Sequence, residues 1–254
     1  MREFDVDIPT RDGVVDTFVC HPDEGGPHPA VVFYMDAPAI REELRDMARR
    51  IATVGYYVVL PNLYYRTARP AAYGFDHRRI RTDDAERAKM YALMHSLTIA
   101  MVVDDTAGLL AFVRGDPNAS RGPLGCVGYC MSGRYVMAAG AAFPDDFAAI
   151  ASYYGVGILT DQPDSPHLAA AAIKAEVYLA FAERDAHVPQ AEVDALAPIL
   201  EKAGTRARIE CYPGTEHGFA FPERAVYVKA AGERHWERMF ALFRRNLAWA
   251  PPRS

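Results

Sequence analysis

The fold of this chain is decided by one stretch, Leu124-Gly125-Cys126-Val127-Gly128-Tyr129-Cys130-Met131-Ser132-Gly133. Its first six residues form a short apolar run typical of a buried strand, and a helical pattern follows directly from Arg134 to Ala139. Between the two, Cys130 lies at the apex of a tight turn. Gly128 comes two residues earlier, where a side chain would crowd so sharp a turn. A strand, a sharp turn with a nucleophile and a helix make up a nucleophile elbow.

The apex position also favours the reactive form of the cysteine. A thiol at a helix N-terminus lies in a partial positive charge that stabilises the thiolate. We therefore interpret Cys130 as a nucleophile and Cys126, inside the strand, as a structural residue. At about 3.3 Å per residue in an extended chain, the two lie too far apart for a disulfide, which needs Cα atoms within about 7 Å.

Length and composition limit the classes of protein that the chain can belong to. The 254 residues are 50% hydrophobic, which fits one large α/β domain as well as two small ones. No repeat, low-complexity tract or linker is evident, so we expect a single domain over residues 1–254. A net charge of −5 gives no basic footprint for nucleic acid. No signal peptide and no apolar run of membrane-spanning length is evident. The four cysteines match no common zinc spacing. We expect a cytoplasmic protein with reduced thiols, no metal, no cofactor and no nucleic-acid or membrane partner; the oligomeric state stays open.

The order of predicted elements indicates a mostly parallel sheet. Alternation at Phe4–Ile8 and Val14–Val19 predicts an antiparallel N-terminal hairpin. From Ala30 onward apolar strands alternate with helical patterns, which is typical of a parallel sheet with helices on both faces. Strands are predicted at Ala30–Met35, Tyr56–Pro61, Ala148–Gly155, Ala175–Phe181 and Ala207–Tyr212, and helices at Glu42–Val54, Asp84–Leu93, Thr98–Arg114, Val193–Lys202 and Trp236–Leu247.

A cysteine nucleophile needs a base and a group that orients the base. In hydrolases with such an elbow these follow in the order nucleophile, acid, histidine. Asp185 comes just after a predicted strand, at the strand end where ligands bind in open α/β sheets. His217 follows the last predicted strand. Glu183 is a rival acid, and His187 is a competing histidine that comes before the last strand.

Several motifs together resemble the dienelactone hydrolase family of the α/β-hydrolase superfamily, over Ala30 to Leu247. They are Gly128–Gly133, the loop of Asp185, Glu216–Phe219, Leu60–Arg66 and Tyr153–Gly157. The resemblance implies an α/β-hydrolase fold and hydrolysis of a small ester or lactone through a thioester acyl-enzyme.

The same resemblance implies roles for individual residues. Cys130, Asp185 and His217 would form the catalytic triad. The backbone N–H groups of Met131 and Ala37 would stabilise the oxyanion of the tetrahedral intermediate. Asp36 matches the position of a family acid that interacts with the resting thiol.

The predicted substrate differs from that of dienelactone hydrolases proper, which hold a substrate carboxylate with arginines. One of those arginines falls where this chain has Phe221, and Arg81 is the candidate for the other. We therefore expect a less charged ester, lactone or thioester, held by a pocket with Phe219, Phe221 and Tyr64.

Two other functions fit the same sequence. The scaffold is also suited to bind a small molecule without turnover, or to sense oxidants through an exposed low-pKa Cys130. A broad carboxylesterase or thioesterase would use the same three residues.

Overall fold

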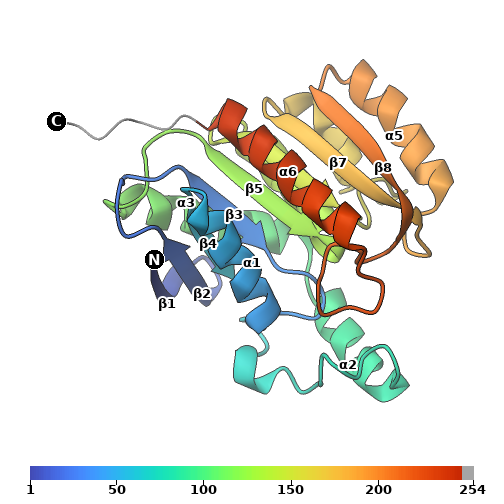
Figure 1. Ribbon diagram of the computed structural model, residues 1–254, viewed down its shortest axis with the longest axis horizontal. Coiled ribbons are helices and arrows are strands. Elements are labelled where there is room, and N and C mark those ends of the chain that lie inside the picture. The colour runs from blue at the N-terminus through green and yellow to red at the C-terminus, as the bar shows by residue number, and fades with distance from the viewer. Residues whose placement is uncertain (248–254) are drawn as a thin grey trace. The chain divides into compact units, whose positions relative to one another are not determined.

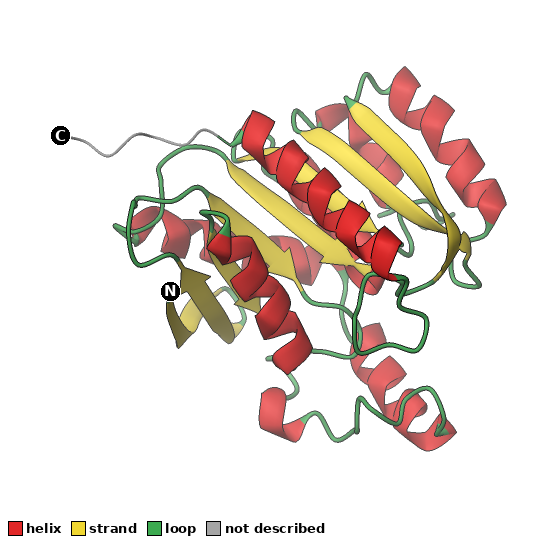
Figure 2. Ribbon diagram, in the orientation of Figure 1, coloured by secondary structure: helices red, strands yellow, loops and turns green. Residues whose placement is uncertain are grey.

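The computed structural model describes residues 1–247, in which strands and helices alternate along most of the chain (Figures 1 and 2). Contacts between residues divide the chain into two compact units, unit 1 at Met1–Ser120 and unit 2 from Arg121 onward. Each is described by itself. The predicted single domain stays a prediction, and its end at Ser254 lies outside the described residues.

Unit 1 contains the N-terminal hairpin and the first parallel strand pair. Its elements are β1 (Arg2–Thr10), β2 (Gly13–His21), β3 (Ala30–Tyr34), α1 (Glu42–Thr53), β4 (Tyr57–Pro61), the short 3-10 helix η1 (Pro70–Ala72), α2 (Asp84–His95) and α3 (Ile99–Gly115). The strands run in the order β1-β2-β4-β3. β1 pairs with β2 and β2 with β4 in antiparallel register, whereas β3 and β4 are parallel.

Helix α1 forms because its apolar residues recur at helical spacing. Leu44, Met47, Ala48 and Ile51 are all buried on one face. The helix is followed by Gly55, which takes a left-handed φ of 107° that favours glycine.

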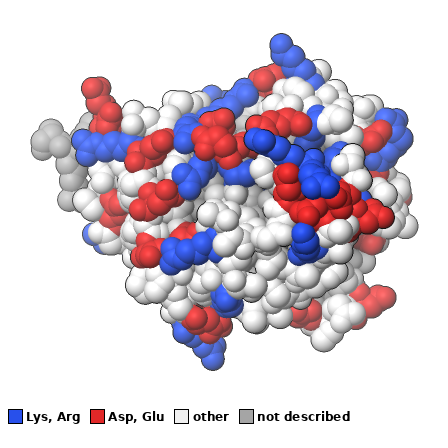
Figure 3. Space-filling model, turned by 90° about the horizontal axis from the view of Figure 1, so that it is seen from below, with Lys and Arg blue, Asp and Glu red and all other residues white. Residues whose placement is uncertain are grey.

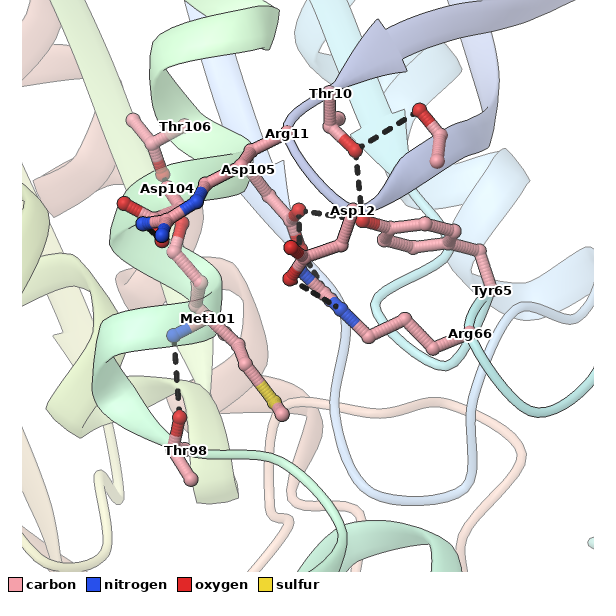
Figure 4. A network of polar contacts seen from close by, with 12 residues as sticks. Thr10, Arg11, Asp12, Tyr65, Arg66, Thr98, Met101, Asp104, Asp105 and Thr106 are labelled. Carbon is pink, nitrogen blue, oxygen red and sulfur yellow. Dashed lines mark hydrogen bonds and ion pairs between the residues drawn. The ribbon is translucent and has the colours of Figure 1, made fainter.

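A buried carboxylate on α3 ties the loop after β4 to this helix (Figure 4). Arg66 donates two hydrogen bonds of 2.8 Å to Asp105, and the Tyr65 hydroxyl donates a third of the same length. Arg66 also pairs with Asp12 in the turn of the hairpin. Burial raises the pKa of Asp105, against the opposing effect of Arg66 and Tyr65.

Unit 2 contains four strands that are all parallel, in the order β5-β6-β7-β8. Its elements are β5 (Leu124–Tyr129), the 3-10 helix η2 (Cys130–Ser132), α4 (Gly133–Ala142), β6 (Phe147–Tyr153), the 3-10 helix η3 (Pro166–Ala172), β7 (Glu176–Arg184), α5 (Gln190–Lys202), β8 (Ala207–Glu216) and α6 (Lys229–Asn246).

Helices cover both faces of the unit 2 sheet. A Cβ at Gly125 would touch Phe243 of α6, whereas one at Gly128 would touch Val136 of α4. Residues three apart in a strand point to opposite faces, so α6 and α4 lie on opposite sides of β5. Figure 1 shows α6 lying across the strands of this unit.

The predicted elements are confirmed in kind and order, and several differ in length. β8 continues to Glu216 rather than ending at Tyr212, with Gly214 inside it in a left-handed conformation at a φ of 72°. Helix α6 begins at Lys229, seven residues before the predicted start at Trp236. The segment Asn62–Asp83 is irregular apart from η1.

Charges of both signs alternate on the face drawn in Figure 3. Within residues 1–247, no single helix has the length and apolar composition to span a membrane. α2 and α3 reach these criteria only when counted together, with a 70° bend between them.

Candidate active site

The strand, tight turn and helix predicted around Cys130 are present. β5 is buried throughout and ends at Tyr129; Cys130 then adopts a φ of 55°, a left-handed conformation that is uncommon for a residue with a side chain. An ideal Cβ at Gly128 would lie 2.6 Å from the carbonyl oxygen of Ser132. The turn therefore requires glycine at position 128. The Cys130 carbonyl accepts a 2.8 Å hydrogen bond from the Val156 amide, which anchors the apex.

Asp185 and His217 are brought together by the register of two parallel strands. Arg184, the last residue of β7, is the register partner of Glu216, the last residue of β8. The residues that follow the two strands, Asp185 and His217, therefore lie at the same edge of the sheet. His217 Nδ1 lies 2.8 Å from Asp185 Oδ2, and the side chains are 13% and 1% exposed.

The second oxygen of Asp185 is also bonded, since it accepts the His187 amide at 2.9 Å. The carboxylate is therefore fixed, and it orients the imidazole through Nδ1. A carboxylate oxygen only accepts, so Nδ1 donates and Nε2 is directed away from the acid. This is the orientation that a general base needs.

The electrostatics of His217 connect it to Cys130. Burial by itself lowers the pKa of His217, but the charge of Cys130 and the bond with Asp185 outweigh burial and raise the pKa to about 9. Nε2 is buried and has no partner at standard hydrogen-bond geometry among the described residues. Among the effects that raise this pKa the charge of Cys130 is the largest, and it favours the protonated imidazole.

The rival acid Glu183 lies apart from this pair, whereas the competing histidine His187 lies beside it. Glu183 accepts the Gly214 amide at 3.0 Å and is largely exposed. His187 is exposed on the loop of Asp185, with its ring centre 4.7 Å from that of His217. Asp185 and not Glu183 therefore meets the histidine.

Tyr154 forms part of the wall behind His217, and the sequence marks it only as part of the motif Tyr153–Gly157, without a role of its own. Its ring contacts His217 edge to face at 4.9 Å, and its backbone is left-handed with φ of 41°. Phe219 and Phe221 both pack against Tyr154 and are fully buried. Both rings therefore pack beside the loop that contains His217, and their predicted role in a substrate pocket stays a prediction.

The remaining predicted residues belong to unit 1. Tyr64 is buried and its hydroxyl donates to the Ala37 carbonyl at 3.0 Å, which fixes the loop after β3. Arg81 is exposed. The predicted roles of Ala37 as an oxyanion donor and of Tyr64 and Arg81 in substrate binding stay predictions.

Asp36 is fully buried and bonded to a cation that sequence reasoning missed. Arg41 contacts both carboxylate oxygens, at 2.6 and 3.2 Å, and also pairs with Glu43 at 2.6 Å. Burial alone would lower the pKa of Arg41, but Asp36 and Glu43 outweigh burial and raise the pKa. The signal for this pair in the sequence is a basic residue, Arg41, five positions after Asp36.

The four cysteines, at positions 20, 126, 130 and 211, are all free, and Cys130 is half-buried. Across residues 1–247 no cluster of three or more His, Cys, Asp or Glu side chains is arranged to hold a metal ion.

Comparison with known proteins gives a consistent family. Residues 15–247 match the dienelactone hydrolase family. A Synechocystis protein named "putative carboxymethylenebutenolidase" is 27% identical over 245 residues, which cover 95% of this chain and 96% of that protein. The carboxymethylenebutenolidase of Pseudomonas putida is 26% identical over 214 residues, which cover 84% of each chain.

A solved structure has the same fold. It is described as a "putative dienelactone hydrolase" of Klebsiella pneumoniae, with a TM-score of 0.83 and 24% identity. The match covers 96% of this chain and 98% of that one.

Proposed function

This chain belongs to the dienelactone hydrolase family, and we propose that it cleaves a small ester or lactone through a Cys130–His217–Asp185 triad. The observation that carries the proposal is the 2.8 Å contact between His217 Nδ1 and a buried Asp185, with a strained Cys130 close enough to raise the pKa of His217. Hydrolysis of carboxylic esters follows from the family; the residues and the intermediate are the proposal.

In the first step the Cys130 thiolate attacks the carbonyl carbon, and a C–S bond forms. The carbonyl oxygen becomes an oxyanion, stabilised by the backbone N–H of Met131, the first residue after the apex, with Ala37 as the second proposed donor. The C–O bond to the leaving alcohol then breaks while His217 Nε2 gives its proton to that oxygen. A thioester and an alcohol result; in a lactone the alcohol stays attached.

In the second step the now neutral His217 takes a proton from water, and the water oxygen attacks the thioester carbonyl. The C–S bond breaks, the acid leaves, and Cys130 returns as the thiolate beside a protonated His217. Asp185 keeps the proton of the imidazole on Nδ1 throughout.

An apolar residue at position 221 supports a substrate without a carboxylate. Phe221 stands where a carboxylate-binding arginine is expected, and it is buried under the ring of Tyr129 at 5.2 Å. We propose a small uncharged acyl group. We retain Asp36 as a proposed partner of the resting thiol and the cytoplasm as the proposed location.

The test compares hydrolysis of p-nitrophenyl acetate and butyrate by the wild type, Cys130→Ser and Cys211→Ser. Cys211 is an exposed thiol on β8 and serves as the matched control. We expect turnover in the wild type and the control, and a loss of more than about 100-fold in Cys130→Ser. Full activity in purified Cys130→Ala would overturn the proposal.

A further inference from the structure

Two strand ends in unit 2 are held in a strained conformation. Among its described non-glycine residues, Cys130 and Tyr154 have left-handed backbone, with φ of 55° and 41°. Each directly follows the last residue of a strand, Tyr129 of β5 and Tyr153 of β6. Such conformations cost free energy and persist when the surroundings hold them in place. Cys130 is the proposed nucleophile and Tyr154 packs on His217, so what holds them bears on catalysis.

One buried residue of α6 contacts both strand ends. His235 is fully buried. Its Nε2 lies 2.7 Å from the Tyr129 hydroxyl, and its backbone oxygen accepts the Tyr153 hydroxyl at 2.9 Å. Tyr129 and Tyr153 are register partners whose rings stack with centres 5.3 Å apart. The two tyrosines and His235 therefore form one cluster under the two turns.

The hydrogen bonds of this cluster fit one arrangement of protons. His235 Nδ1 lies 2.8 Å from the carbonyl oxygen of Gly232, which can only accept. In the neutral imidazole Nδ1 therefore donates, and Nε2 accepts the proton of the Tyr129 hydroxyl. A buried polar cluster whose members are all satisfied is rigid.

The two turns above the cluster are bonded to each other. The Val156 amide, two residues after Tyr154, donates to the Cys130 carbonyl at 2.8 Å. We propose that His235 is a positioning residue that sets the Cys130 sulfur relative to His217 by fixing the ends of β5 and β6. This inference rests on the proposed pairing of Cys130 with His217.

Three variants test the inference. His235→Leu removes both side-chain hydrogen bonds, while His235→Gln offers an amide that can donate to Gly232 and accept from Tyr129. Phe243→Leu is the matched control, because Phe243 lies two turns further along α6 and packs on Gly125 at the other end of β5. It perturbs the same helix and strand away from the turn.

The main readout is the rate at which iodoacetamide alkylates Cys130, measured against pH. The thiolate sulfur displaces iodide from the CH₂ group, and peptide mass analysis separates Cys130 from Cys211, which is exposed and serves as an internal reference. Thermal unfolding, and kcat and KM on p-nitrophenyl acetate, are measured on the same preparations.

We expect His235→Leu to shift the pH profile of Cys130 alkylation and to lower kcat by about tenfold or more, with a smaller change in KM, because misplacement by 1 Å costs about 100-fold. His235→Gln should restore part of the pH profile and part of kcat. The alkylation rate of Cys211 should be the same in all variants as in the wild type. Phe243→Leu should lower the Tm without shifting the profile.

A folded His235→Leu whose profile and kcat match those of Phe243→Leu would overturn the inference. If His235→Leu fails to fold, Tyr129→Phe takes its place, because it removes only the hydroxyl that bonds His235. It must then shift the pH profile of Cys130 alkylation in the same way. Alkylation needs no substrate, so it tests positioning alone. Full esterase activity in Cys130→Ala would instead overturn the proposed function.

Discussion

Gly133→Ala should disable the enzyme although alanine is the better helix former. An ideal Cβ at Gly133 would lie 2.2 Å from Cα of Gly155 and 2.9 Å from its carbonyl carbon. Nonbonded carbons prefer about 3.5–4.0 Å, so one backbone must move by more than about 1 Å. Gly155 lies between Tyr154 and Val156, which contact His217 and Cys130. A 1 Å misplacement costs about 100-fold in rate, so we expect kcat to fall at least that far.

Gly140→Ala is the matched control on the same helix. Its Cβ would also lie 2.2 Å from a neighbour, but that neighbour is the terminal Cδ1 of Ile150, a side-chain atom that can rotate away. Replacing glycine by alanine in a helix stabilises the fold by about 1 kcal/mol. Overpacking destabilises it by about 1–3 kcal/mol. Ester hydrolysis and urea unfolding are measured on both variants. Equal activity and stability of the two would refute the reasoning.

Three further predictions concern the charged groups. Asp185→Asn should lower kcat by roughly 1,000-fold, because an amide no longer fixes the proton of His217 on Nδ1; a loss below tenfold in steady-state assays would contradict this. Cys130→Ala should lower the pKa of His217 below about 9 in an NMR titration. The raised pKa of His217 stabilises the fold below pH 6.5, and this stabilisation is lost as the pH rises through about 9. The Tm of the wild type should therefore fall relative to that of Cys130→Ala between pH 6.5 and about 9. Parallel Tm curves would refute this. Arg66→Met should destabilise the fold by about 3 kcal/mol at pH 7.5, since it leaves Asp105 buried and unpaired by a cation. The loss should be smaller at pH 4, because burial raises the pKa of Asp105 and protonation removes its charge; equal losses in urea unfolding at both pH values would argue against this.

Local patterns were enough to predict the elements and the triad candidates. Buried parallel strands are continuous apolar runs, and Gly128 marks the turn because backbone, not a distant contact, crowds it. Asp185 and His217 each follow a strand end. Parallel register then brings such positions to one edge of the sheet.

Contacts distant in sequence could not be predicted in this way. His235 meets Tyr129 across 106 positions. Its helix begins earlier than predicted, so its place on the buried face with Met239 and Leu242 was overlooked, although the spacing of four and seven residues is visible in the sequence. The burial of Phe221 under Tyr129 likewise depends on tertiary packing.

The most direct test of the central claim is to trap the acyl-enzyme. The wild type is mixed with p-nitrophenyl butyrate, quenched in acid within one turnover, and analysed by intact mass and peptide mapping. The account predicts one butyryl group on the peptide that contains Cys130, which hydroxylamine removes. It predicts that Cys130→Ser shows neither turnover nor a butyryl group. A butyryl group on another residue, or turnover with no adduct on Cys130 at any quench time, would contradict it.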